Sequence, residues 1–306
     1  MARRLAAADI GSNTVHLLVA SVGSGRVRRI RNDSDWIGLG ESVSREGRIS
    51  EFTQGTLISS LLNFQAISAS HKAEALYVLA TEAVRSASNG EAVLAEIQRR
   101  TGLEVQVISG EREAVLGLRG ALIDTRPAEH FAFAEVGGGS AQLASCDGRQ
   151  VTDEMSLPIG TGRLTAMFSL EFPCRPPSLA KVESYVADIV STFSPTFKPT
   201  KLIASGGVAR GLVRALHPDG DRRIHLSELE YLVWATQRLT VEQTSQRFGV
   251  KLKRASTLML GSVIFRQVLD HLSLNEVQVS EFGVREGALL EIAEGGLILP
   301  GLAKVG

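Results

Sequence analysis

Three short segments rich in glycine and serine each follow an apolar run that is typical of a buried strand. They are Gly11-Ser12-Asn13-Thr14, Gly137-Gly138-Gly139-Ser140 and Ser205-Gly206-Gly207. The backbone N–H groups of such a turn point outward and form a concave anion site, and glycine lets a phosphate approach the main chain. One turn alone indicates no more than a hairpin. Three turns that each follow a strand favour phosphate binding.

Two acidic residues occupy equivalent places beside the first two turns. Asp9 and Glu135 each end an apolar strand, two positions before the first glycine of the turn. A carboxylate at this place suits a divalent cation that is held against phosphate oxygens, because Mg²⁺ prefers oxygen ligands and keeps several waters. The alternative is a residue that caps the turn. Because the pattern occurs twice, we predict Asp9 and Glu135 as metal ligands.

A further carboxylate and a guanidinium are candidates for catalysis and substrate binding. Glu113 lies one turn into a predicted helix that starts after Ser109-Gly110, where the helix dipole favours the ionised form. A carboxylate there can accept a proton from an attacking water, although by position alone a solvated acid is the simpler interpretation. Arg85 follows a predicted strand, and arginine binds phosphate in a fork geometry that lysine cannot copy.

The elements that position these residues alternate between strands and helices. Strands are predicted over 5–10, 14–22, 26–32, 75–80 and 103–108, with helices over 53–73, 90–100 and 111–122. After a candidate linker at 124–129 the pattern restarts. Strands are predicted over 131–136, from the glycine turn to 146, after the turn at 147–148, and over 201–204, with helices over 179–193, 226–248 and 258–272. This alternation indicates an α/β fold. Two halves that each begin with a three-stranded meander and a glycine turn indicate an internal duplication.

Length and composition restrict the class of protein. The 306 residues are enough for two packed domains, and 44% hydrophobic with 22% charged residues is globular composition. Basic and acidic residues number 33 each, which argues against a nucleic-acid partner. Cys146 and Cys174 form neither a disulfide framework nor a zinc motif, and no apolar stretch is long enough to span a membrane. We therefore expect a cytoplasmic protein with no membrane partner.

Six segments occur in an order that one known family shares. They are Asp9–Val19, Thr81–Gly90, Ile108–Ala114, Val136–Ser140, Ser205–Val208 and Val279–Gly287. With them the sequence resembles the exopolyphosphatase / guanosine pentaphosphate phosphatase (Ppx/GppA) family of the actin-like (sugar kinase, Hsp70) fold superfamily, from residue 5 to about residue 294. The match is to the short, two-domain form of the family.

The resemblance implies an α/β fold made of duplicated ribonuclease-H-like domains of the actin-like ATPase superfamily around an interdomain cleft. It implies a first domain over 1–126, a second over 127–285, and a C-terminal helix over 286–306 that packs back on the first. The family's catalytic glutamate falls on Glu113 and its phosphate-binding arginine on Arg85. With the three turns, the expected phosphate-binding residues are Gly11, Ser12, Asn13, Thr14, Arg85, Gly137, Gly138, Gly139, Ser140, Ser205, Gly206 and Gly207.

The activity implied by the resemblance is a metal-assisted attack of water on a terminal phosphoryl group. We expect an exopolyphosphatase that uses Mg²⁺ or Mn²⁺ with Asp9 and Glu135 to release orthophosphate from inorganic polyphosphate, and we expect a homodimer. Guanosine pentaphosphate is the alternative substrate, while a kinase of the same superfamily and a weakly catalytic phosphate-chain or alarmone-binding protein are alternative functions. The basic residues Arg26, Arg28, Arg29 and Arg31 are candidate contacts for a polyanion.

Three departures from the family pattern change the charge or the reach of an acidic residue. Glu135 stands where members usually carry aspartate, and its carboxylate reaches one methylene further. Gln142 replaces a glutamate, so it cannot act as a base and is a weaker cation ligand than a carboxylate. Arg112 also replaces a glutamate, directly before Glu113. These departures bear on metal affinity and rate.

Overall fold

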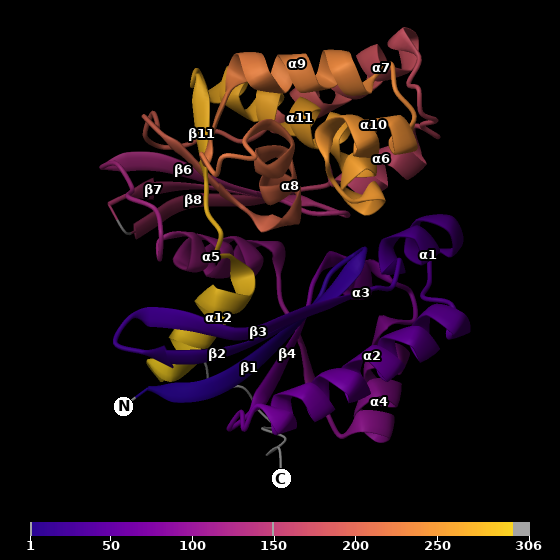
Figure 1. Ribbon diagram of the computed structural model, residues 1–306, viewed down its shortest axis with the longest axis vertical. Helices are drawn as coiled ribbons and strands as arrows, with labels where there is room; N and C mark the ends of the chain where they lie inside the picture. The colour runs from indigo at the N-terminus through magenta and orange to yellow at the C-terminus, as the bar shows by residue number, and fades with distance from the viewer. Residues whose placement is uncertain (1, 149, 296–306) are drawn as a thin grey trace. The chain divides into compact units, whose positions relative to one another are not determined.

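The computed structural model describes residues 2–148 and 150–295, and the chain divides into two compact units (Figure 1). Unit 1 comprises the chain up to Ile123 together with the segment that starts at Gly283, and unit 2 comprises Asp124–Phe282. Each unit contains one mixed β-sheet with helices packed against it. None of the helices in the described ranges combines the length and the apolar composition needed to cross a membrane.

The sheet of unit 1 has the strand order β3-β2-β1-β4-β5. β1 (Arg3–Ile10), β2 (Thr14–Gly23) and β3 (Arg26–Trp36) form an antiparallel meander, and β4 (Leu76–Ala80) and β5 (Val105–Val107) continue the sheet parallel to β1. Most residues of β1, β2 and β4 are buried, as in a sheet that is covered on both faces. The predicted meander is therefore confirmed, with β3 reaching Trp36 rather than Asn32.

Six helices complete the described part of unit 1. They are α1 (Leu39–Glu46), α2 (Glu51–Ser70), α3 (Glu82–Ser86), α4 (Gly90–Thr101), α5 (Gly110–Ala121) and α12 (Val284–Ala293). The α5 helix begins where the sequence predicts, because the Ser109 hydroxyl accepts a hydrogen bond from the Arg112 amide. The α1 helix was not predicted, since it is short and starts after Gly38 in the left-handed conformation rather than at a serine or aspartate cap.

The α12 helix packs against α5 through two close backbone contacts. A Cβ atom on Gly120 would lie 2.0 Å from the carbonyl oxygen of Gly283, and one on Gly287 would lie 1.9 Å from that of Leu116. Only glycine fits at these two positions. α12 ends at Ala293, and residues 296–306 of the predicted C-terminal helix lie outside the described residues.

Two buried charged residues join α12 to the sheet of unit 1. Arg285 donates to the carbonyl oxygen of Leu17 (3.2 Å) and to Asn32 Oδ1 (2.8 Å). Glu286 is 1% exposed and accepts hydrogen bonds from Arg29 (2.8 Å) and from the backbone N–H at the start of the helix (3.0 Å). A buried charge is tolerated when it is paired and hydrogen-bonded in this way.

The sheet of unit 2 has the strand order β10-β11-β9-β6-β7-β8. β6 (His130–Val136), β7 (Ala141–Asp147) and β8 (Gln150–Leu157) form an antiparallel meander, β9 (Leu202–Ser205) and β11 (Glu276–Val279) run parallel to β6, and β10 (Arg223–His225) is antiparallel at the edge. Apart from β10, the strands of this sheet have the same order and the same relative directions as the strands of unit 1. The predicted duplication of an α/β fold is confirmed.

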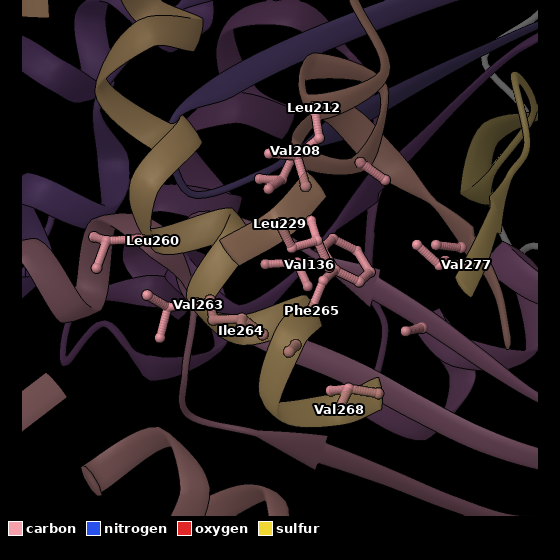
Figure 2. Close-up of a cluster of buried hydrophobic side chains, with 14 of the residues drawn as sticks. Val136, Val208, Leu212, Leu229, Leu260, Val263, Ile264, Phe265, Val268 and Val277 are labelled. Carbon is pink, nitrogen blue, oxygen red and sulfur yellow. The ribbon is translucent and has the colours of Figure 1, made fainter. Parts of the chain in front are cut away.

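Six helices pack in unit 2: α6 (Thr161–Met167), α7 (Pro176–Val190), α8 (Gly206–Leu216), α9 (Leu226–Thr236), α10 (Val241–Phe248) and α11 (Leu252–Leu272). Figure 2 shows the buried side chains of α8, α9 and α11, such as Val208, Leu229 and Phe265, packed with Val136 of β6. The helical stretch predicted over 226–248 is two helices, because Thr240 and Gln243 form a capping box that starts α10.

Candidate active site

In unit 1 the predicted residues gather at the carboxyl ends of the parallel strands β1, β4 and β5. At this edge the residue that follows β4 donates a backbone hydrogen bond of 3.2 Å to the last residue of β1, and the residue that follows β5 donates one of 2.9 Å to the last residue of β4. Asp9 lies at the end of β1, Arg85 lies in α3 after β4, and Glu113 lies in α5 after β5. Ligands of open α/β sheets bind at this edge. The topology thus brings together three residues that are far apart in the sequence.

The first glycine loop, Gly11–Thr14, joins β1 to β2. Its first N–H donates to the carbonyl oxygen of its last residue at 3.1 Å. The carbonyl oxygens of Ser12 and Asn13 accept hydrogen bonds of 2.6 to 3.0 Å from backbone amides of residues 37–40, the segment that follows β3. This supporting segment was not predicted, because it contributes backbone atoms rather than a recognisable side chain.

The second glycine loop, Gly137–Ser140, is built in the same way. Its first N–H donates to the carbonyl oxygen of its last residue at 2.9 Å, and its three glycine carbonyls accept hydrogen bonds from backbone amides of residues 160–163, the segment that follows β8. Arg163 adds a side-chain hydrogen bond of 2.8 Å from Nε to the Gly139 carbonyl oxygen. A Cβ atom on Gly160 would lie 2.4 Å from the loop backbone, so the segment and the loop are in direct contact.

In both loops the carbonyl groups are hydrogen-bonded, whereas some backbone N–H groups are available to a ligand. Among the described residues, none accepts a hydrogen bond from the amides of Ser12, Asn13, Gly138 or Gly139. Successive backbone N–H groups with this freedom form an anion-binding nest. Both units therefore contain a loop with the same backbone hydrogen-bond pattern and with N–H groups that lack an acceptor in the described residues.

The third predicted turn differs from the other two. β9 ends at Ser205 and α8 begins at Gly206, so Ser205-Gly206-Gly207 is a strand followed directly by a helix N-terminus rather than a turn between strands. Gly206 has a φ of +92°, and a Cβ atom there would lie 3.0 Å from Cγ of Glu135. The glycine lets the Glu135 side chain pass over the start of the helix.

A row of polar side chains crosses the sheet of unit 2 beside the second loop. Ser205, Glu135, Gln142 and Ser156 are neighbours in register on β9, β6, β7 and β8. The Ser205 hydroxyl donates to the Glu135 carboxylate. Gln142 is 1% exposed and donates from Nε2 to Ser140 Oγ (2.7 Å) and to Ser156 Oγ (3.3 Å). Ser205 thus contacts the predicted metal ligand, and its own contact with phosphate stays a prediction.

The corresponding row in unit 1 contains Asp9, His16 and Ser34 on β1, β2 and β3. His16 is not among the residues predicted for the site, and the register places it beside Asp9. The sequence spacing could have identified His16, because it lies as many positions after Asp9 as Gln142 lies after Glu135.

The environment of Asp9 disfavours a charged carboxylate in the absence of a cation. Oδ1 of Asp9 is buried and has no hydrogen-bond partner among residues 2–148 and 150–295. Burial raises the pKa of Asp9 to about 6, Arg285 acts in the opposite direction, and Glu286 adds to the rise. A cation ligand at Oδ1 would stabilise the ionised form.

Each of the two carboxylates, one in each unit, is a separate candidate cation ligand. No group of three or more His, Cys, Asp or Glu residues in the described ranges is arranged to hold a metal ion. Mg²⁺ is usually bound through one or two carboxylates and completes its coordination with water and substrate phosphates. The buried Oδ1 of Asp9 and the Glu135 carboxylate, oriented by Ser205, each fit such a ligand.

The arginine predicted for binding reaches from α3 to the start of α5, where the glutamate predicted for catalysis lies. Arg85 is exposed, and its guanidinium donates to the carbonyl oxygen of Ile108, just before that helix. Glu113 is half-buried in the first turns of α5. Unit 1 therefore places the guanidinium that we predict to bind phosphate, and a carboxylate, at the same sheet edge as the first glycine loop.

The basic residues of β3 are less available than the sequence indicates. Arg29 forms an ion pair with the buried Glu286 (2.7 Å), and Arg31 forms one with Asp33 (2.6 Å). Their charges are already balanced within unit 1. Arg26 and Arg28 remain candidate contacts for a polyanion.

Similarity to known proteins extends over both units. The model of the Ppx/GppA phosphatase family matches residues 18–295. Exopolyphosphatase 1 of Mycobacterium leprae (strain TN) is 27% identical over 94% of this chain and 88% of its own length, and Exopolyphosphatase 1 of Mycobacterium tuberculosis (strain H37Rv) is 28% identical over 94% and 87%. The crystal structure of an exopolyphosphatase from Cytophaga hutchinsonii gives a TM-score of 0.88 at 25% identity over 96% of this chain and 98% of its own. That of the Aquifex aeolicus Ppx/GppA family member gives 0.83 at 25% identity over 97% and 100%.

Proposed function

The chain belongs to the Ppx/GppA phosphatase family, and on that premise we propose that it is an exopolyphosphatase that releases terminal orthophosphate from inorganic polyphosphate. The observation that carries the proposal is the duplicated glycine loop. Its carbonyl oxygens accept backbone hydrogen bonds from a supporting segment, and its two middle N–H groups have no acceptor among the described residues. Polyphosphate has neither base nor sugar. A site for it needs repeated N–H and cationic contacts, which the loops and Arg85 offer.

The reaction is hydrolysis of a phosphoric anhydride. A water oxygen attacks the terminal phosphorus, Glu113 accepts the water proton, and the bond from that phosphorus to the bridging oxygen breaks, so that orthophosphate and a chain shorter by one unit are released. The loop amides and Arg85 hold the phosphoryl oxygens, where positioning and charge stabilisation supply most of the acceleration. Glu113 suits the task because it lies in the first turns of α5, where the helix dipole favours negative charge.

A divalent cation, Mg²⁺ or Mn²⁺, is part of the proposal. Asp9 in unit 1 and Glu135 in unit 2 are each a residue that could ligate it, and when bound it would neutralise phosphate charge and polarise the phosphoryl group. The raised pKa of Asp9 supports this assignment, because a buried carboxylate without a partner favours either a proton or a cation.

Guanosine pentaphosphate is the second candidate substrate, and the exposure of Trp36 beside the first loop favours it. Trp36 is 40% exposed and is paired in register with Thr14, the last residue of the first loop. An exposed indole beside a phosphate loop can stack on a guanine base. The Trp36→Leu substitution should then weaken the nucleotide and leave polyphosphate unaffected.

The test is kcat/KM for phosphate release from tripolyphosphate, longer polyphosphates, guanosine pentaphosphate and ATP, each with Mg²⁺ and Mn²⁺. We expect short to medium polyphosphate to be preferred, and its affinity to fall with salt because the contacts are largely ionic. A preference for guanosine pentaphosphate that is lost in Trp36→Leu would reverse the order of the two substrates. Transfer from ATP to an acceptor would indicate a kinase, and binding without release would indicate a sensor.

Two further expectations belong to this proposal. The free, buried thiols of Cys146 and Cys174 fit a reducing compartment such as the cytoplasm. A homodimer is expected, and light scattering of the purified chain would test it by measuring the molar mass in solution.

A further inference from the structure

The hydroxyl of Ser140 has an unusual hydrogen-bond environment at the end of the second glycine loop. Ser140 is 6% exposed, and its Oγ accepts a hydrogen bond from Nε2 of Gln142 at 2.7 Å. The same amide nitrogen donates to Ser156 Oγ at 3.3 Å, and Gln142 itself is 1% exposed. In the described part of the chain, no acceptor takes the proton of the Ser140 hydroxyl.

The chemistry of the two groups fixes the direction of this hydrogen bond. An amide NH₂ group has two protons and no acceptor capacity, so it can only donate to the serine oxygens. A serine hydroxyl has one proton and two lone pairs, and when a lone pair is occupied by Gln142 the proton must point elsewhere. Nε2 divides its two protons between Ser140 and Ser156, which leaves the proton of the Ser140 hydroxyl available to a ligand.

We propose that Gln142 is a positioning residue that makes the Ser140 hydroxyl a hydrogen-bond donor to a phosphate oxygen in the second loop. The inference rests on the proposed function, since the ligand is a phosphate of the substrate chain or of the product. The loop then offers the hydroxyl proton together with the amides of Gly138 and Gly139, and all three are neutral donors. This half of the site therefore binds phosphate without requiring a cation.

A carboxylate at position 142 would reverse the polarity of the contact. Glutamate has nearly the shape of glutamine but accepts hydrogen bonds only, so the Ser140 proton would turn towards it and away from the ligand. A hydrogen bond to a charged group is typically one of the stronger ones. We expect the Gln142→Glu substitution to weaken phosphate binding about tenfold or more.

The experiment measures the dissociation constant of inorganic tripolyphosphate by calorimetry in excess chelator, so that cation ligation does not contribute. The variants are Gln142→Glu, Gln142→Met, Ser140→Ala and the two double variants with Ser140→Ala. Gln142→Met removes the donor without adding charge and covers the case in which a buried carboxylate prevents folding. Gln278→Met on β11 is the matched control for a glutamine-to-methionine change in the same sheet.

The coupling between the two positions separates positioning from simple charge repulsion. We expect both Gln142 variants to weaken binding in the wild-type background, and to have less than a twofold effect once Ser140 is alanine. An equal loss in both backgrounds would show that position 142 acts through charge or packing alone and would overturn the inference. Wild-type affinity in Gln142→Glu would also overturn it, because it would mean that Ser140 donates to residue 142.

The inference and the proposed function can fail separately. A wild-type protein that hydrolyses polyphosphate with Mg²⁺ but does not bind tripolyphosphate in chelator overturns the role of Ser140 and leaves the activity standing. A wild-type protein that binds tripolyphosphate with the expected coupling but releases no phosphate from any substrate keeps the positioning role and overturns the hydrolase assignment.

Discussion

Replacing Gly160 by alanine should displace the second glycine loop. The added Cβ atom would lie 2.4 Å from the backbone of Gly138 and Gly139, whereas ordinary van der Waals contact begins at 3.4 Å. The backbone of Gly160 has φ −72° and ψ 154°, which alanine adopts without strain, so the whole effect comes from this contact. The loop must retreat by about 1 Å, and a misplacement of that size can reduce catalysis about 10²-fold.

The assay is kcat/KM for phosphate release from polyphosphate, together with the melting temperature of each variant. Gly160→Ala should lower kcat/KM about a hundredfold and stability by about 1–3 kcal/mol, the usual effect of overfilling a packed region. Gly40→Ala is a graded comparison, because its Cβ would lie 3.0 Å from the Ser12 side chain and needs a smaller shift. Gly55→Ala is the control in α2, where no atom lies within 4 Å, and it should keep full activity and gain up to about 1 kcal/mol.

The relative losses of kcat/KM in the three variants test this explanation. If Gly160→Ala keeps wild-type kcat/KM while the melting temperature is unchanged, the loop is not held by residues 160–163 as described. If Gly40→Ala is the more damaging of the two, contact distance does not determine loop position. A loss of kcat/KM in the folded Gly160→Ala protein is the expected result.

Four other predictions concern catalysis, cations and pH. Glu113→Gln should lower kcat about 10²–10⁴-fold with substrate binding retained, and near wild-type phosphate release would contradict its role as the base. Excess chelator should abolish turnover, and full activity in chelator would rule out the proposed cation. Arg85→Ala should mainly raise KM, with Arg85→Lys restoring only part of the loss; equal activity of the wild type and the lysine variant would make Arg85 structural. Burial raises the pKa of Asp153, but hydrogen bonds from Ser145, Thr152 and Thr196 outweigh it and lower the pKa from 3.8 to about 2. The stabilisation by this carboxylate, about 1 kcal/mol after solvent screening, is therefore present above pH 3.8 and lost as the pH falls towards 2, so the stability difference between wild type and Asp153→Asn should shrink over that range.

The strands and helices that carry the site follow from local patterns. Apolar runs that end in glycine turns predict β1, β6 and the loops after them, and Ser109 predicts the start of α5 and hence the place of Glu113. These features depend on residues a few positions apart, so the sequence contains the whole signal. The same reasoning missed α1 and joined α9 to α10, because short helices depend on caps and packing more than on periodicity.

The sequence by itself determined the duplication, the acidic residues at the strand ends and the three glycine segments. Only the tertiary structure decided how the carbonyl groups of the loops are held, because that depends on hydrogen bonds from residues 37–40 and 160–163, which follow the third strand of each meander. The register of β7 with its neighbours likewise decided that Gln142 contacts Ser140 and Ser156. These contacts form between residues that are distant in the sequence, and they involve backbone atoms or depend on the strand register. The residue types alone therefore do not predict them. Short segments of this sequence therefore indicate which residues can bind phosphate or a cation. The hydrogen bonds that position these residues form only when the strands pair.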